Sequence, residues 1–279
     1  MSIKIVTDST ADIPPRLAEE LDISVVPVYV RFGNQTFRDR IDITEEQFYQ
    51  RLKNDPVHPK TMQPSPNDFA NVYRNLAKKC EGIVSIHLTS KLSGTYNAAL
   101  QGRIEVTEGC PVEVIDSQVV TMGLGQLVLA ANAMARSGQK LHEIVAGVKR
   151  LIPAIHLLGL LDTLKYLDIG GRIGKVQVLL SSILSVKPLL TMKEGLLVPV
   201  GVSRTRSGGI DRLYSFVKNA RNIRELAVVY NTTPDDAHSL IDRISSFFPK
   251  EKICLARLGP GLGVHGGPGI LFVSIMSTI

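Results

Sequence analysis

The sequence predicts an α/β protein of two domains, with a doubly wound, mostly parallel sheet in the N-terminal domain and a mixed sheet in the C-terminal α/β domain. Three observations favour this fold class. In the first half, short apolar segments alternate with segments of helical periodicity. In the second half, two apolar segments flank a glycine-containing turn, which is typical of a β-hairpin. The length of 279 residues reaches the size at which single hydrophobic cores stop growing.

The N-terminal half is expected to alternate strands with helices. Thr44 and Gln47 have the spacing of a capping box, which marks a helix start. Pro27 falls within an expected strand and suggests an edge or a bulge, whereas the proline-rich residues 56–66 are expected to form a loop. The expected strands cover residues 3–7, 24–30, 82–88 and 112–115, and the expected helices cover 14–20, 44–53, 67–79, 97–107, 123–137 and 141–151. This alternation implies right-handed crossovers between parallel strands.

The C-terminal half follows a different pattern. The helix expected at 141–151 ends before Pro153, so we place the domain boundary there, with residues 1–153 in the first domain and 154–279 in the second. The expected strands cover residues 156–161, 186–192, 196–203, 227–230, 252–258 and 270–275, and the expected helices cover 163–168, 176–184, 208–220 and 234–247. A hairpin followed by further strands and helices indicates a mixed sheet with its helices on one side.

Composition argues against several classes of partner. The net charge of +6 is spread over the chain without a dense Lys/Arg stripe and interleaved aromatics, so nucleic acid is not an expected partner. No apolar run approaches the roughly 20 residues of a membrane-spanning helix, so no integral membrane segment is expected. The first ten residues lack the features of a signal peptide, which predicts a cytoplasmic protein. Cys80, Cys110 and Cys254 form no C-x-x-C pair and are interpreted as reduced, packed thiols.

Hydroxyl-rich turns follow three of the expected parallel strands, at residues 7–10, 89–95 and 116–117. Ligands of doubly wound sheets lie beyond the carboxyl ends of the strands, so these turns mark a candidate binding site. Ser93, Gly94 and Thr95 come just before a helix and can offer hydroxyls and free backbone N–H groups to an anion. Alternatively, Ser93 or Thr95 only caps that helix.

His265 lies in a glycine-rich segment, residues 259–269, where backbone can approach a ligand closely. We expect this lone histidine to be exposed rather than packed. The segment contains G-x-G-x-x-G, but Pro268 and the β-branched residues that follow argue against the helix that a dinucleotide site needs. No P-loop and no H-E-x-x-H motif occurs, so neither an ATP site nor a metal site is expected.

Arg172 and Arg204 fall in loops of the second half, flanked by glycine or serine, and Arg206 is expected in the same loop as Arg204. A single loop arginine is usually a solvated charge. Two such loops in one domain favour contact with an anionic group, phosphate included, or with an acidic partner surface.

These motifs together resemble the DegV family, the fatty-acid-binding subunits of bacterial fatty acid kinase systems. They occur in order over nearly the whole chain. The matching stretches are Thr7 to Asp12, Lys60 to Pro66, Thr89 to Asn97, Ile115 to Ser117, Leu164 to Ile173, Lys187-Pro188 and Gly263 to Gly269. Met62 and Gly266 depart from the family pattern, which often has a small polar residue and threonine, respectively, at these positions.

The resemblance implies a long-chain fatty acid buried between the two domains as the bound ligand, without a cofactor or a catalytic residue of the chain's own. By motif position, Thr61, Ser93 and His265 would contact the carboxylate, with Gly94 beside them. A separate kinase subunit would phosphorylate the fatty acid, and an acyltransferase would carry the acyl phosphate into phospholipid synthesis. Arg172 and Arg204 would serve the kinase encounter or the phosphoryl group.

Physical chemistry is consistent with this expectation. A chain of about sixteen carbons gains on the order of 12 kcal/mol from burial before ordering costs, which only an enclosed apolar tunnel can provide. Two alternatives stay open. The first is a serine hydrolase using Ser93, His265 and Asp8, although the G-x-S-x-G elbow is missing. The second is a lipid sensor without an enzymatic partner.

Overall fold

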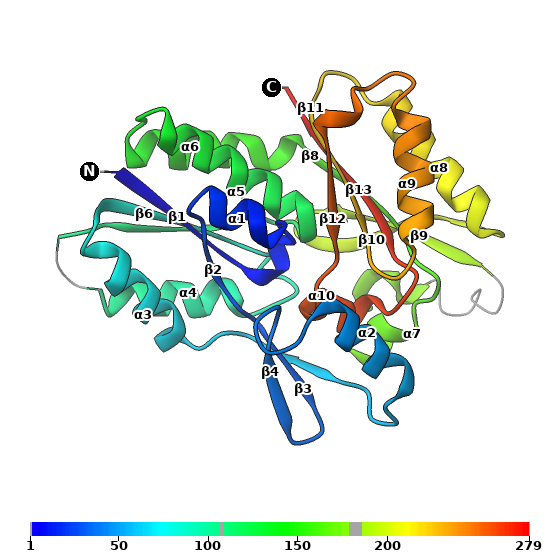
Figure 1. Ribbon diagram of the computed structural model, residues 1–279, viewed down its shortest axis with the longest axis horizontal. Helices are drawn as coiled ribbons and strands as arrows, with labels where there is room; N and C mark the ends of the chain where they lie inside the picture. The colour runs from blue at the N-terminus through cyan, green and yellow to red at the C-terminus, as the bar shows by residue number, and fades with distance from the viewer. Residues whose placement is uncertain (1, 107–108, 179–185, 279) are drawn as a thin grey trace.

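The computed structural model describes residues 2–278 except 107–108 and 179–185, and its described strands form three sheets (Figure 1). The first sheet is fully parallel and has the order β2-β1-β6-β7. Its strands are β1 (Ser2–Asp8), β2 (Ser24–Val26), β6 (Cys80–His87) and β7 (Val112–Asp116). The parallel sheet expected in the N-terminal half is therefore confirmed.

Helices cover both faces of this sheet, as a doubly wound fold requires. Phe69 and Tyr73 of α3 lie on one face, where they share a hydrophobic cluster with Ile83 of β6. On the other face, Leu127 of α5 lies in the same cluster as Ile5 of β1. The helices of this half are α1 (Pro15–Glu20), α2 (Glu45–Asn54), α3 (Pro66–Ala77), α4 (Thr95–Ile104), α5 (Thr121–Arg136) and α6 (Leu141–Leu151).

The second sheet is mixed and has the order β10-β9-β8-β13-β11-β12, with only β11 and β12 parallel. The helices α8 and α9 cover one face (Figure 1), whereas the other face packs against α5 of the first half. One hydrophobic core therefore joins the two larger sheets. The elements are β8 (Ile155–Leu160), α7 (Lys165–Ile169), β9 (Lys187–Lys193), β10 (Leu196–Ser203), α8 (Arg206–Asn219), β11 (Ile223–Tyr230), α9 (Pro234–Ile244), β12 (Ile253–Arg257), α10 (Pro260–Gly266) and β13 (Leu271–Ser277).

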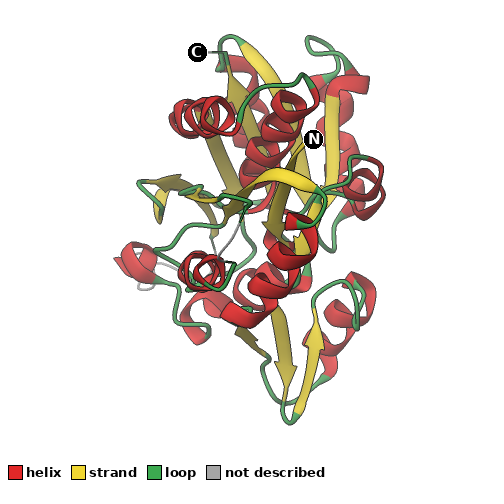
Figure 2. Ribbon diagram, turned by 90° about the vertical axis from the view of Figure 1, so that its left-hand side faces the viewer, coloured by secondary structure: helices red, strands yellow, loops and turns green. Residues whose placement is uncertain are grey.

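A small antiparallel sheet that the sequence did not predict projects from the body of the molecule (Figures 1 and 2). It consists of β3 (Tyr29–Phe32), β4 (Gln35–Arg38) and β5 (Lys60–Met62) in the order β4-β3-β5. The single strand expected at 24–30 was wrong, because it divides at Pro27 into β2 and β3 of different sheets. The N–H of Val28 donates to Ser9 Oγ at 3.1 Å instead of joining a ladder.

Three other expectations need correction. Residues 56–66 are not a loop throughout, because they contain β5. The glycine-rich segment contains the short helix α10, which starts with Pro260 at its first position, although no helix follows Gly266. Arg206 begins α8 rather than lying in a loop. The helix expected at 176–184 lies mostly outside the described residues. Among the described helices, none is long and apolar enough to cross a membrane.

Candidate ligand-binding site

A cavity of about 360 Å³ lies between residues of both halves of the chain. Most of its wall is aliphatic, with one aromatic ring. The apolar lining comprises Val28, Met62, Leu88, Leu92, Val120, Leu161, Leu167, Leu190, Leu197, Leu258, Leu262, Ile270 and Phe272. Such a wall favours an elongated hydrocarbon group, because burying apolar surface is the main favourable contribution it can offer.

Polar side chains also contribute to the wall of the cavity. They are Thr10, Thr61, Gln63, Ser93, Arg172 and His265. Thr61 Oγ1 lies 2.9 Å from His265 Nε2, so β5 and α10 meet there although 204 residues separate them. The expectation that His265 is exposed was wrong, since the residue is half-buried. Its Nδ1 is fully buried and has no hydrogen-bond partner among the residues that the structure describes.

The absence of a side chain at Gly170 leaves the space that the His265 ring occupies. A Cβ atom at Gly170 would lie 2.2 Å from His265 Nδ1, so any side chain there would displace the ring. Burial, followed by the positive charge of Arg172 and by His58, lowers the pKa of His265 to about 4. The ring is therefore neutral at pH 7 and carries one proton. With that proton on Nε2, the ring donates to Thr61 and leaves the threonine hydroxyl free to donate to a ligand.

Ser93 forms the second part of the polar wall and lies next to Gly94 at the start of α4. Ser93 Oγ accepts from the N–H of Thr95 at 3.3 Å and lies 2.9 Å from Thr95 Oγ1. Ser93 therefore contributes to the helix start and lines the cavity at the same time. Gln63 covers Gly94 so closely that a Cβ there would lie 2.1 Å from Gln63 Oε1. Glycine at this position thus allows the Gln63 side chain to reach the cavity.

The two predicted arginines occupy different environments. Arg172 lines the cavity, and its Nε and Nη1 donate to Leu92 O at 3.3 Å and Gly170 O at 2.7 Å. Within the described part of the chain, its Nη2 makes no hydrogen bond and is available to an anion. Arg204 is exposed and does not line the cavity. The structure thus brings Thr61, Ser93 and Arg172 together with His265, but leaves Arg204 apart.

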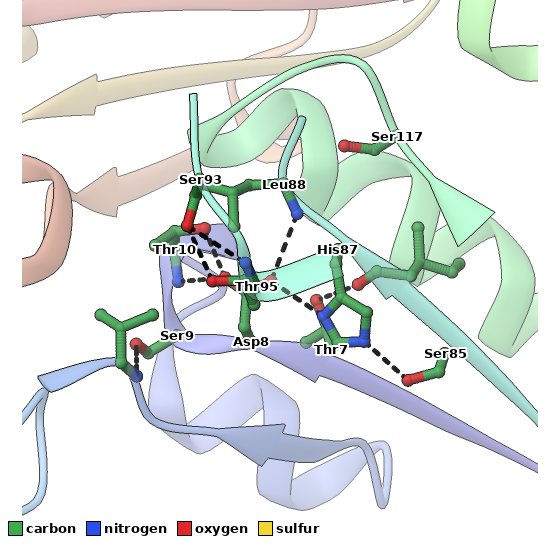
Figure 3. A network of polar contacts seen from close by, with 12 residues as sticks. Thr7, Asp8, Ser9, Thr10, Ser85, His87, Leu88, Ser93, Thr95 and Ser117 are labelled. Atoms are coloured by element: carbon green, nitrogen blue, oxygen red, sulfur yellow. Dashed lines mark hydrogen bonds and ion pairs between the residues drawn. The ribbon is translucent and has the colours of Figure 1, made fainter. Parts of the chain in front are cut away.

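Asp8 belongs to a buried network next to the cavity (Figure 3). Its Oδ2 lies 2.9 Å from His87 Nδ1, so Asp8 pairs with His87 and not with His265. The hydrolase triad of Ser93, His265 and Asp8 is therefore not assembled. Asp8 instead accepts the N–H groups of Thr10 and Leu88, two residues that line the cavity.

A second buried cluster, consisting of Asp12, Asp39 and Arg40, holds the start of α10. The N–H of Gly259 donates to Asp12 at 2.8 Å, and the N–H of Gly261 donates to Asp39 at 3.2 Å. Arg40 Nη2 donates to Asp12 Oδ1 at 2.9 Å. Sequence reasoning missed this cluster, because its partners are far apart in the chain and only Asp12 lies in a recognisable motif.

The two departures from the family pattern have visible surroundings. Met62 lines the cavity and is 44% exposed, so it contacts both the cavity and solvent. Gly266 is buried, and a Cβ there would lie 2.1 Å from Ile270 Cδ1. Glycine therefore makes room for Ile270 in the cavity wall. Among the described residues, no group of three or more His, Cys, Asp or Glu side chains is arranged to hold a metal ion.

Comparison with known proteins identifies relatives of the whole chain. The family model described as "Uncharacterised protein, DegV family" matches residues 2–278. A fatty-acid-binding DegV family protein from Thermus thermophilus is 33% identical, with a TM-score of 0.91 and 100% of each chain covered. DegV of Bacillus subtilis, a fatty acid binding protein, is 27% identical, with a TM-score of 0.90 over 99% of this chain and 100% of that one. A stearic acid-binding protein from Eubacterium ventriosum is 27% identical, with a TM-score of 0.88 over 98% of each chain. The chain thus belongs to the DegV family.

Proposed function

We propose that this chain binds a long-chain fatty acid and presents its carboxylate to a separate kinase subunit. The observation that carries the proposal is the cavity itself, whose wall is apolar except for a few hydrogen-bonding side chains. A fatty acid has the same division, with a long hydrocarbon chain and one polar head. The relatives from Thermus thermophilus, Bacillus subtilis and Eubacterium ventriosum, all described as binding fatty acids, support this proposal.

The polar wall suits a carboxylate. An ionised carboxylate only accepts hydrogen bonds, so it needs donors around it. Ser93 and Thr61 can each donate a hydroxyl proton, and Arg172 can donate from Nη2. Neutral His265 adds no charge but orients Thr61. We assign the head-group site to these residues, with Gly94 shaping the wall through Gln63.

Acyl phosphate formation requires a partner. In that reaction a carboxylate oxygen attacks the γ-phosphorus of ATP, and ADP leaves with the electron pair of the broken P–O bond. The sequence carries no P-loop, so the proposal assigns ATP binding to the kinase subunit. Exposed Arg204 is suited to contact with that subunit, and an acyltransferase would consume the product. We further propose that domains 1–153 and 154–279 enclose the ligand between them.

Solvent extraction and mass spectrometry of the purified protein test the binding step. We expect about one fatty acid per chain, and a lipid-free protein that takes up no added fatty acid would contradict the proposal. The kinase step is tested separately with labelled ATP. The isolated chain should form no acyl phosphate until a kinase subunit is added, and turnover by the chain alone would exclude the carrier role.

A further inference from the structure

Thr95 lies next to the cavity-lining Ser93 but does not itself line the cavity. Thr95 is the first residue of α4 and is fully buried. Its hydroxyl lies 2.9 Å from the Ser93 hydroxyl, and its N–H donates to the same Ser93 oxygen at 3.3 Å. Figure 3 shows both contacts beside the Asp8 network. Thr95 thus holds Ser93 Oγ through two groups.

The direction of the hydroxyl contact follows from where each proton can go. Among the described residues, Ser93 Oγ is the only hydrogen-bond partner of the Thr95 hydroxyl. A buried hydroxyl proton without an acceptor is costly, so Thr95 donates to Ser93. Ser93 then accepts from both the hydroxyl and the N–H of Thr95. The proton of the Ser93 hydroxyl is then not used in the bond to Thr95. Because Ser93 lines the cavity, this proton can be donated to a ligand there.

We propose that Thr95 is a positioning residue for fatty-acid recognition, which sets the Ser93 hydroxyl as a donor to the ligand carboxylate. The inference rests on the proposed function. Thr95 would then affect ligand binding without lining the cavity. A hydroxyl that accepts hydrogen bonds becomes a stronger donor. A carboxylate accepts such a bond more strongly than a neutral group does.

A double-mutant cycle tests this role. Delipidated parent protein, Thr95→Val, Ser93→Ala and the double variant are titrated with labelled stearic acid. Thr95→Val keeps the side-chain volume and the backbone N–H but removes the hydroxyl. We expect about tenfold weaker binding for Thr95→Val and at least that loss for Ser93→Ala. Because Thr95 acts through Ser93, the double variant should bind no more weakly than Ser93→Ala.

Two further variants serve as controls. Thr95→Ser restores the hydroxyl and should bind within about twofold of the parent. Thr89→Val removes another buried hydroxyl of the same loop, which donates to Gly195 O at 2.9 Å, and should leave affinity unchanged. Should Thr95→Val not fold, Thr95→Ala replaces it in the cycle against Thr95→Ser.

The outcomes are distinct. Parent-like binding by a folded Thr95→Val, or losses that multiply in the double variant, would overturn the role of Thr95. A parent protein that binds no stearic acid or other long-chain fatty acid would overturn the proposed function instead. Equal losses in Thr95→Val and Thr95→Ser would also overturn the inference, because they would point to packing rather than to the hydroxyl.

Discussion

Two clusters of buried carboxyl groups hold the cavity wall, and they differ in how their oxygens are satisfied. The Asp8 carboxylate accepts from the N–H and hydroxyl of Thr10, from the N–H of Leu88 at 3.2 Å and from His87 Nδ1 at 2.9 Å. Both of its oxygens therefore have partners. Among the described residues, no lysine or arginine is hydrogen-bonded to this buried carboxyl group.

Asp12 and Asp39 are buried like Asp8, but their carboxyl oxygens have fewer hydrogen-bond donors around them. Among the described residues, Asp12 Oδ2 and Asp39 Oδ1 have no hydrogen-bond partner, although the positive charge of Arg40 acts on both carboxyl groups. Burial raises the pKa of Asp12 to about 6 and that of Asp39 to about 7, against the opposing effect of Arg40. At Asp12 and Asp39, where the set of hydrogen-bond donors is incomplete, burial therefore outweighs the nearby positive charge of Arg40.

The largest expected effect comes from removing the carboxylate of the satisfied cluster. Asp8→Ala leaves four backbone and side-chain donors around Asp8 without their acceptor, and we expect the free energy of unfolding to fall by about 3–5 kcal/mol. Urea denaturation measures it. Asp235→Ala removes an exposed acid from the first turn of α9 and should cost less than about 1 kcal/mol. If the two variants lose similar amounts of unfolding free energy, the hydrogen bonds to Asp8 do not stabilise the fold as we expect.

The second cluster should show its difference as a pH dependence. The pKa of Asp39 is raised to about 7 from 3.8, so the folded state holds the proton more tightly than the unfolded state. The parent therefore loses this contribution as pH rises from about 4 to about 7. Asp39→Asn cannot titrate, so its unfolding free energy should gain at least about 1 kcal/mol relative to the parent over that range. A pH-independent difference between the two proteins would argue against the raised pKa.

The cluster of Asp12, Asp39 and Arg40 holds the start of α10. This helix carries His265, the partner of Thr61 in the cavity wall. Thr61→Val keeps the shape but removes the hydroxyl, and we expect about tenfold weaker fatty-acid binding from the lost hydrogen bond to a charged group. Thr36→Val, in the exposed part of the same small sheet, is the matched control. If both variants keep the same lipid content and affinity as the parent, Thr61 is not a head-group residue.

The smallest effect on lipid binding is expected at the arginines. Arg172 lines the cavity, so Arg172→Ala should lower lipid affinity severalfold. Exposed Arg204 should be different. Arg204→Ala is expected to keep its lipid but to slow kinase-dependent phosphorylation, an effect that added salt reduces in the parent. Lipid loss from Arg204→Ala, or none from Arg172→Ala, would reverse this assignment.

Sequence patterns within a few residues of each other predicted the helix starts and the strands of the parallel sheet. The capping box at Thr44 and the apolar periodicity of the parallel sheet both appear in the structure. Two elements could not be predicted in this way. The strands of the small sheet have only three or four residues and are interrupted by proline. The helix α10 is short and rich in glycine, and Asp12 and Asp39 of the other half hold its start.

The same reasoning applies to the site. The composition of their segments indicated Ser93 and His265 as candidate ligand contacts, whereas Thr61 was assigned only through the resemblance to the DegV family. The role of Arg40 had no local signal, since its contact with Arg257 O spans 217 residues. The sequence also placed Arg172 and Arg204 together, because both are loop arginines beside small residues. Only the packed structure separates the arginine that lines the cavity from the exposed one.

The position of β13 has a consequence for biosynthesis. This strand follows α10 in the chain, yet it lies between β8 and β11 in the middle of the mixed sheet. During translation, the parallel sheet can form early, because its four strands end at Asp116. The mixed sheet has no centre until residues 271–277 leave the ribosome. The nascent chain therefore lacks the central partner of β8 while residues 161–270 are made, and that of β11 while residues 231–270 are made. We expect it to depend most on chaperones during this interval, when apolar strand edges are exposed.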